Sequence, residues 1–209
     1  MPGPGLDLVG DEELAELTEV IRSGRLSRYG PDDDSFPAKV RSFELAVAEQ
    51  ADVRHALAVN AGTSALFLAL VGLGVGPGDE VIVPGFTYVA TISSVVYARA
   101  LTVLAEVDAT FDLDPVDVEA RITPRTKAIV VVHMLGAPAR IDELKDVADR
   151  HGLALIEDAA QAFGATHRGR WAGSIGDAGA YSFNEYKTIT AGDGGMLVTS
   201  DDDLFERCF

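Results

Sequence analysis

The stretch from Tyr181 to Gly195 reads Tyr-Ser-Phe-Asn-Glu-Tyr-Lys-Thr-Ile-Thr-Ala-Gly-Asp-Gly-Gly and joins two short apolar segments. These segments, Ala178–Phe183 and Gly195–Thr199, have the length and composition of buried β-strands. Between them lies Lys187, with aromatic and aliphatic neighbours. A lysine is a useful nucleophile only where desolvation or a nearby cation leaves part of it neutral. Most lysines are exposed, so the hypothesis of a reactive Lys187 depends on the other groups that the chain brings near it.

A carboxylate ends another apolar segment. Asp158 follows Leu-Ala-Leu-Ile-Glu, and ligands of open α/β sheets bind beyond the carboxyl ends of the strands. A carboxylate there can keep a pyridine nitrogen protonated, which makes the ring an electron sink. The alternative is a helix cap, because Asp before Ala-Ala-Gln starts helices well and Glu157 stands beside it. Gln161 could hydrogen-bond a ring hydroxyl or could be polar filling.

Hydroxyl groups and a glycine follow a third apolar segment. Gly62, Thr63 and Ser64 join a predicted strand to a predicted helix, where free N–H groups and the helix dipole favour an anion. Capping alone is the alternative, since Ser and Thr are common at helix starts. Ser182 adds a hydroxyl five residues before the lysine. Tyr88, just past a strand, could stack on a planar ring or pack in the core.

A reactive lysine, a carboxylate at a strand end and a hydroxyl-lined helix start are parts of one kind of site. They suit an aldehyde cofactor that carries a phosphate and a basic ring nitrogen, and pyridoxal 5′-phosphate (PLP) is such a molecule.

The rest of the chain predicts an α/β fold. After two helices the apolar runs of four to six residues alternate with helical patterns, which indicates a mostly parallel sheet covered on both faces. The predicted helices are Asp11–Ser23, Pro37–Gln50, Ala65–Leu73, Tyr88–Ala98, Asp114–Ile122 and Asp142–His151, and the further strands are Ala56–Val59, Glu80–Val83, Leu101–Glu106, Ala128–His133 and Leu153–Ile156. Asp201–Phe209 reads as a capped helix without a stop signal, so we expect the front part of a longer protein.

The composition excludes several classes of protein. The formal charge of −16 argues against a nucleic-acid or anionic-membrane surface, without excluding a small basic pocket. One cysteine, Cys208, excludes an internal disulfide, and the four histidines show no metal-ligand spacing. With neither a signal peptide nor a run of about 20 apolar residues, we expect a soluble protein of the cytoplasm.

Several blocks, in this order, resemble the DegT/DnrJ/EryC1/StrS family of PLP-dependent aminotransferases, over about residues 22–209. The blocks are Gly-Thr-Ser-Ala-Leu (62–66), Gly-Asp-Glu-Val-Ile-Val-Pro (78–84), Phe-Thr-Tyr-Val-Ala-Thr (86–91), Glu-Asp-Ala-Ala-Gln (157–161), Ser-Phe-Asn-Glu-Tyr-Lys (182–187) and Gly-Asp-Gly-Gly (192–195). Any one of them is weak evidence, whereas the ordered set is highly specific.

The resemblance implies a role for each site residue. Lys187 would bond to the cofactor and move a proton between substrate and cofactor, and Asp158 would pair with the ring nitrogen. Gln161 would contact the ring oxygen and Tyr88 would stack on the ring. The phosphate would be held by Gly62, Thr63, Ser64 and Ser182.

The resemblance also implies the architecture. The fold would be a three-layer sandwich with a mainly parallel seven-stranded sheet, the fold type I (aspartate-aminotransferase-like) large domain. Residues 1–36 would form an N-terminal helix and substrate loop, and residues 37–209 the PLP-binding large domain. The small C-terminal domain of the family is absent from this chain. A homodimer with a shared active site is expected.

The expected reaction is transamination of a keto-sugar, nucleotide-linked in the family, or of a keto-cyclitol, with glutamate or glutamine as donor, in sugar or natural-product biosynthesis. The alternatives are another PLP reaction, such as elimination or epimerisation, and a non-catalytic binding or regulatory protein. Two departures from the family concern the surroundings of the site. Phe163 replaces a common histidine, and the loop Leu26–Phe36 carries an acidic insertion.

Overall fold

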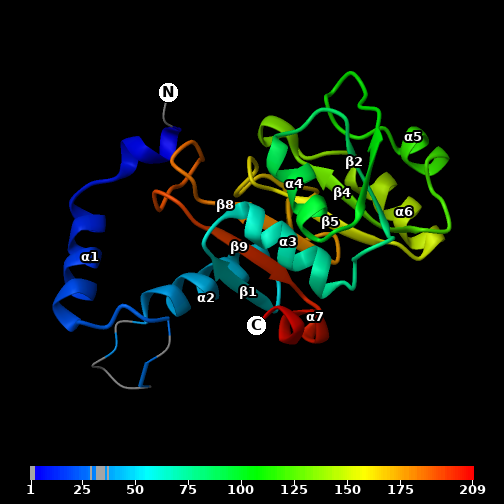
Figure 1. Ribbon diagram of the computed structural model, residues 1–209. Coiled ribbons are helices and arrows are strands. Elements are labelled where there is room, and N and C mark those ends of the chain that lie inside the picture. The colour runs from blue at the N-terminus through cyan, green and yellow to red at the C-terminus, as the bar shows by residue number, and fades with distance from the viewer. Residues whose placement is uncertain (1–2, 29, 32–35, 37) are drawn as a thin grey trace.

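The chain is described by a computed structural model that covers residues 3–28, 30–31, 36 and 38–209. Its centre is a seven-stranded sheet with the order β1-β9-β8-β5-β4-β2-β3 (Figure 1). Only β9 runs antiparallel to its neighbours, and the other pairs are parallel. The strands are β1 (His55–Val59), β2 (Glu80–Pro84), β3 (Leu101–Ala105), β4 (Thr126–Val132), β5 (Ala154–Asp158), β8 (Ala178–Ser182) and β9 (Gly195–Thr199). The predicted α/β fold with a mainly parallel seven-stranded sheet is confirmed.

The helices lie close to their predicted ranges. They are α1 (Asp11–Ser23), α2 (Lys39–Ala51), α3 (Gly62–Gly72), α4 (Val89–Tyr97), α5 (Pro115–Ala120), α6 (Ile141–His151) and α7 (Asp202–Cys208), with the short 3-10 helices η1 (Pro4–Leu8) and η2 (Met134–Gly136). One boundary bears on the site. Helix α3 begins at Gly62 rather than at the predicted Ala65, so the Gly-Thr-Ser turn is its first turn. A small hairpin, β6 (Thr166–His167) with β7 (Arg170–Trp171), was not predicted because each strand has only two residues.

The strand alternation builds a three-layer core. On β2, Val81 and Val83 pack with α3 and α4 on one face, while Ile82 packs toward α5 and α6 on the other. Strand β4 alternates in the same way. Burial of each such aliphatic side chain contributes about 1.5–3 kcal/mol relative to exposure. A third cluster, which includes Tyr181 and Phe183, lies between α2 and the β1–β9–β8 end of the sheet.

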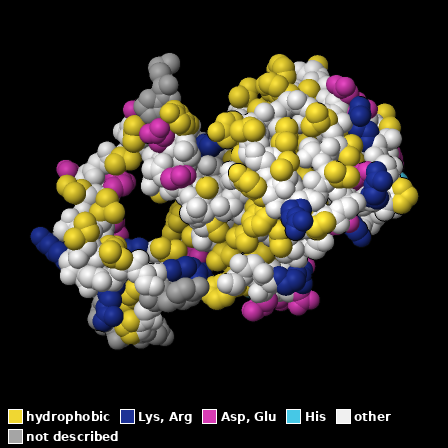
Figure 2. All heavy atoms as spheres, in the orientation of Figure 1, with side chains coloured by type: hydrophobic (Ala, Val, Ile, Leu, Met, Phe, Trp, Pro, Cys, Tyr) yellow, Lys and Arg dark blue, Asp and Glu magenta, His cyan; other side chains and the backbone are white. Residues whose placement is uncertain are grey.

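The N-terminal segment lies apart from this core and then returns to it. Helix α1 has no buried residue, and it stands away from the sheet in Figure 1. Its apolar residues, which include Leu14 and Leu17, are exposed, and Figure 2 shows a gap between this segment and the main body. Before α1, the segment around η1 lies beside the loop between β8 and β9 (Figure 1). The predicted acidic run Asp32–Asp34 lies outside the described residues.

In the part of the chain that the structure describes, no helix is long and apolar enough to cross a membrane.

Candidate active site

A cavity of about 500 Å³ lies where the parallel strands end. Its walls come from the start of α3, the segment before α4, the end of β5, and the end of β8 with the loop that follows. The lining residues are Ala61, Gly62, Thr63, Leu66, Thr87, Tyr88, Ala90, Asp158, Ala160, Gln161, Ser182, Asn184, Tyr186, Lys187 and Asp193. The structure thus brings together every predicted site residue except Ser64, from segments more than 100 residues apart in the sequence.

Asp158 reaches this cavity because of the alternation along β5. Ile156, two residues earlier, packs on the α3–α4 face of the sheet, so Asp158 faces the same side. Its Oδ2 accepts a hydrogen bond from the Thr91 hydroxyl at 2.7 Å and its Oδ1 accepts one from the Ala160 N–H at 3.2 Å. Residues 159–165 form turns without a helix, so the helix-cap alternative is wrong.

Two opposing effects act on the charge of Asp158. Burial raises the pKa of this carboxyl above its ordinary value. The hydrogen bonds from Thr91 and Ala160 and the charge of Lys187 act in the opposite direction. Because burial disfavours the charge of this carboxylate, a nearby cation or hydrogen-bond donor stabilises it strongly. Such a partner is what a ring nitrogen provides.

The neighbouring carboxylate, Glu157, faces the opposite side of the sheet. It is fully buried, and its Oε2 lies 2.8 Å from the Nε2 of the equally buried His133. It also accepts hydrogen bonds from the backbone N–H groups of Gly173, Ile175 and Gly176. Although burial disfavours its charge, the hydrogen bonds from His133 and the backbone hold the pKa of Glu157 below its ordinary value. Glu157 therefore braces the loop before β8 and has no access to the cavity.

Lys187 is half-buried in the loop between β8 and β9. Burial lowers the pKa of its amine, and the nearby Asp158 acts against that shift. The loop is held by backbone hydrogen bonds from Lys187 N to Asn184 O at 3.0 Å and from Gly5 N to Lys187 O at 3.2 Å. A desolvated amine with a lowered pKa is neutral more often at pH 7, which is what nucleophilic chemistry requires.

The start of α3 lies in the cavity wall beside the lysine loop, and a helix start of this kind favours an anion. The residue before the helix, Ala61, has no capping side chain, so the N–H groups of Gly62 and Thr63 receive no side-chain acceptor from it. A Cβ on Gly62 would lie 2.8 Å from the Cβ of Ser182, so only glycine permits this close approach. Thr63 and Ser182 add hydroxyls to the wall. Ser64 does not line the cavity, because its hydroxyl donates to the Asn60 side chain at 2.7 Å.

The amide of Gln161 is oriented by a backbone contact. The N–H of Leu135 donates to Gln161 Oε1 at 2.9 Å, so the amide nitrogen is the group left for the cavity. That nitrogen is a donor and suits a ring oxygen that accepts. Tyr88, 66% exposed, stands on the rim immediately before α4. Its stacking on a ring stays a prediction.

Four polar lining residues were not singled out from the sequence: Thr87, Asn184, Tyr186 and Asp193. Asn184 and Tyr186 lie in the quoted lysine stretch, so their position next to Lys187 was the available signal. Asn184 Oδ1 accepts from the Tyr186 N–H at 3.1 Å and so shapes the turn that presents the lysine. Asp193 lies further along the same stretch, and Thr87 immediately precedes Tyr88, so their positions were the signal there.

Phe163 does not reach the cavity. Its ring makes edge contacts with Trp171, Tyr181 and Phe183, with centroids 5.2, 5.2 and 5.7 Å away. The departure from the family's histidine therefore lies in the aromatic core behind the site.

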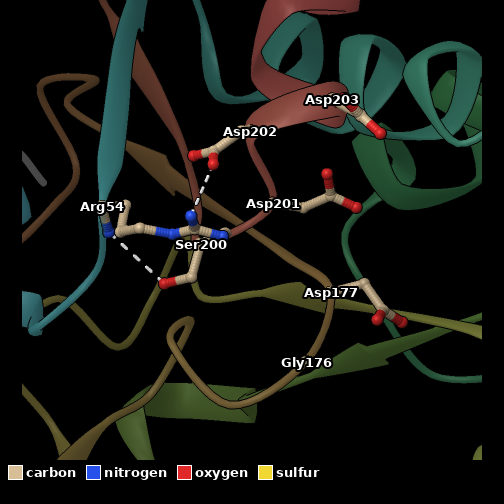
Figure 3. Close-up of a pocket in the computed structure, with 7 residues that line it drawn as sticks. All are labelled: Arg54, Gly176, Asp177, Ser200, Asp201, Asp202 and Asp203. Carbon is tan, nitrogen blue, oxygen red and sulfur yellow. Dashed lines mark hydrogen bonds and ion pairs between the residues drawn. The ribbon is translucent and has the colours of Figure 1, made fainter.

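A second pocket, also of about 500 Å³, lies at the other ends of the strands (Figure 3). It is acidic, but three of its charged side chains and the carboxylate of Asp202 have structural partners. Arg54 pairs with Asp202, the Asp201 carboxylate caps α7, and Asp177 accepts from the Leu155 N–H. Among the described residues no group of three or more His, Cys, Asp or Glu is arranged to hold a metal ion.

Comparisons with known proteins agree with one another on a single family. A sequence model described as the DegT/DnrJ/EryC1/StrS aminotransferase family matches residues 7–209. GDP-perosamine synthase of Caulobacter vibrioides is 55% identical over 163 residues, which are 78% of this chain and 44% of that protein. L-glutamine:2-deoxy-scyllo-inosose aminotransferase of Streptoalloteichus tenebrarius is 48% identical over 195 residues, 93% of this chain and 46% of that protein.

A solved structure extends the agreement to three dimensions. NtdA from Bacillus subtilis, crystallised with bound cofactor PMP, superposes with a TM-score of 0.86 at 32% identity, and the match covers 98% of this chain and 46% of that one. The chain spans about half the length of the curated relatives it matches.

Proposed function

The chain belongs to the DegT/DnrJ/EryC1/StrS aminotransferase family, and we propose that its cavity binds PLP and transfers an amino group to the ketone of a sugar or cyclitol. Glutamate or glutamine is the proposed donor, and the proposed setting is sugar or natural-product biosynthesis. One observation carries the proposal: Lys187, Asp158 and the open start of α3 line the same cavity.

The residues present fit this cofactor. The uncapped first turn of α3, with Thr63 and Ser182, offers N–H and hydroxyl donors to a phosphate. The buried carboxylate of Asp158 suits the ring nitrogen, and the free amide nitrogen of Gln161 suits the ring oxygen. Tyr88 on the rim suits a ring face. The cavity volume of about 500 Å³ is in the usual range for cofactor sites.

When bound, PLP supplies an electron sink that accepts the charge developing at the substrate carbon. The chain's own residues would do the rest. The Lys187 Nζ, with its lowered pKa, would hold the cofactor through its aldehyde carbon and would accept and return a proton beside the substrate. Asp158 would hold the ring nitrogen in its protonated form. The residues that line the cavity would hold the substrate so that its reacting carbon lies near Lys187, and they would exclude water.

The substrate class rests on the relatives. One carries the name GDP-perosamine synthase and another the name L-glutamine:2-deoxy-scyllo-inosose aminotransferase. We therefore infer a polyhydroxylated cyclic ketone for this protein, nucleotide-linked or free.

A second copy of the chain is the proposed protein partner. The edge strand β3 and the adjacent α4 expose Leu104, Leu101, Val96 and Tyr97, each at least half exposed. An exposed apolar edge of this kind marks an interaction site. Sedimentation at micromolar concentration is expected to give a dimer, and Leu104→Glu is expected to weaken it; a monomer for the unaltered protein would overturn this part.

The experiment for the reaction uses purified full-length protein with added PLP. The wild type is expected to turn yellow, to bleach with borohydride while keeping the cofactor attached at Lys187, and to change its visible spectrum when glutamate or glutamine is added. Lys187→Ala is expected to stay folded without attachment, and Lys127→Ala, which removes an exposed lysine, is the matched control.

Product analysis with a keto-sugar or keto-cyclitol separates the alternatives. An amino product supports transamination, whereas elimination or epimerisation products would identify another PLP reaction. Protein without colour or attachment would indicate a binding or regulatory protein. Normal turnover by Lys187→Ala would rule out the proposed mechanism.

A further inference from the structure

A buried threonine next to the cavity has no role in the proposed reaction. Thr91 lies in the first turn of α4 and is fully buried. Its hydroxyl is 2.7 Å from Asp158 Oδ2 and 2.8 Å from the hydroxyl of Thr87. Thr87 lines the cavity and Thr91 does not. The three side chains form a continuous hydrogen-bonded row from the cavity wall to the back of the carboxylate.

The chemistry of the groups orders this row. An ionised carboxylate only accepts, so Thr91 must donate its single hydroxyl proton to Asp158. In its contact with Thr87 the Thr91 oxygen can then only accept, so the Thr87 hydroxyl is the donor of that hydrogen bond. The row is therefore complete when Asp158 is charged, and protonation of Asp158 on Oδ2 would require both hydroxyls to reorient.

The row also fixes the orientation of the carboxylate. Oδ2 is held by Thr91 and Oδ1 by the N–H of Ala160 at 3.2 Å. A carboxylate has about four acceptor positions, so further positions are left for a partner in the cavity.

We propose that Thr91, supported by Thr87, is a positioning residue that aims the Asp158 carboxylate at the ring nitrogen of bound PLP and favours its charged form. This rests on the proposed function for the identity of the partner. The hydrogen-bonded row itself is independent of that identity, so the two ideas can fail separately.

The electrostatic setting agrees with this role. Burial raises the pKa of Asp158, and the Thr91 hydrogen bond is the leading effect that opposes the rise. The other charged or titratable groups that act on the carboxyl are Lys187 from the β8–β9 loop and His133 after β4. None of them takes the place of a hydroxyl that points directly at Oδ2.

The test is the titration of Asp158 in the cofactor-free full-length protein, followed by ¹³C NMR of labelled aspartate and assigned with Asp158→Asn. Thr91→Val keeps the side-chain shape and removes the hydroxyl. It is expected to increase the proton affinity of Asp158 about tenfold or more, a rise in pKa of about one unit. Thr91→Ser is expected to restore the wild-type value.

Ser94→Ala is the matched control. It removes a buried hydroxyl from the same helix that donates to a carbonyl rather than to Asp158, so it is expected to leave the titration unchanged. Thr87→Val is expected to raise the pKa of Asp158 as well, but by less than Thr91→Val does. If Thr91→Val does not fold, Thr87→Val is used in its place.

The outcomes are distinct. An unchanged titration in Thr91→Val, no recovery in Thr91→Ser, or an equal shift in Ser94→Ala would overturn the positioning role. If Thr91→Val does not fold, an unchanged titration in Thr87→Val would do so. PLP affinity, measured separately, is expected to fall in Thr91→Val and recover in Thr91→Ser. A wild type that binds no PLP would refute the proposed function, while the NMR titration would still decide whether the hydroxyl row acts on Asp158.

Discussion

Replacing Glu157 by glutamine is expected to destabilise the fold without touching the cavity. The carboxylate accepts hydrogen bonds from His133 and from three backbone N–H groups of the loop before β8. Glutamine has nearly the same shape, but one of its two terminal atoms is a donor. Whichever way the amide lies, that donor meets two other donors.

The histidine has little freedom to adapt. His133 Nδ1 accepts from the N–H of Ala139 at 3.0 Å, so Nε2 carries the proton that points at Glu157. Each buried donor left without an acceptor costs about 1–3 kcal/mol, and the glutamine amide nitrogen leaves two such donors, so the loss is about 2–6 kcal/mol. We expect Glu157→Gln to lower the free energy of unfolding by this amount, a large part of the 5–15 kcal/mol of a typical domain.

The assay is urea unfolding of cofactor-free protein followed by circular dichroism. Because the pKa of Glu157 in the fold is below its ordinary value of 4.5, its contribution is fully present above pH 4.5 and is lost as the pH falls through the folded value. The difference between wild type and variant is therefore expected to be largest at pH 7 and to shrink in acid. Glu49→Gln, on the exposed side of α2, is the control.

The adjacent carboxylate, Asp158, has the opposite effect on the free energy of unfolding. The pKa of Asp158 is raised, so its charge costs stability at neutral pH and that cost disappears as the pH falls through the folded value. Asp158→Asn is expected to leave the free energy of unfolding unchanged or to raise it by about 1 kcal/mol, and to abolish turnover.

The prediction for Glu157 has a clear refutation. If the free energy of unfolding of Glu157→Gln lies within about 0.5 kcal/mol of the wild-type value at pH 7, the hydrogen bonds of Glu157 do not stabilise the fold as argued above.

Three further predictions concern the lysine loop and the start of α3. Gly5→Ala places a Cβ 2.9 Å from the backbone of the lysine loop, so it is expected to cost about 1–3 kcal/mol and to speed proteolysis of that loop. Gly10→Ala, whose Cβ would meet only the Leu8 carbonyl oxygen at 4.0 Å, is the control and is expected to do neither. Gly62→Ala is expected to push the start of α3 away from β8 and so to weaken PLP binding at least about tenfold, which is about 1.4 kcal/mol. Gly76→Ala, with open space around it, is the control and is expected to leave the affinity unchanged. Equal affinities in the two variants would contradict the proposed phosphate site. The pKa of Lys187 is lowered, so its acylation, mapped by mass spectrometry, is expected to reach half its maximal rate at a lower pH than that of exposed lysines; a midpoint at or above theirs would contradict the burial argument.

Much of the site could be predicted from local sequence. The apolar runs and helical periodicities predicted the strands and helices, because both depend on residues within a few positions of one another. Asp158 at a strand end and a helix that follows the Gly-Thr-Ser turn came from the same reading, although the helix begins at Gly62 and not at the predicted Ala65. The structure places both beside Lys187 in one cavity.

Other features depend on segments that are distant in sequence. Glu157 and Asp158 are adjacent carboxylates, and only the register of β5 in the sheet sends one toward His133 and the other toward the cavity. The same holds for Thr91, which meets a carboxylate 67 positions away.

The sequence by itself thus determined the order of strands and helices along the chain, the lysine that is the candidate nucleophile and the class of cofactor that its neighbours suit. Only the tertiary structure decided that Ser64 turns to Asn60, that Gln161 presents its nitrogen, and that Gly5 holds the lysine loop. The physical reason is range: backbone preferences act between near neighbours, whereas the partner of a hydrogen-bonding group is chosen by how whole elements pack.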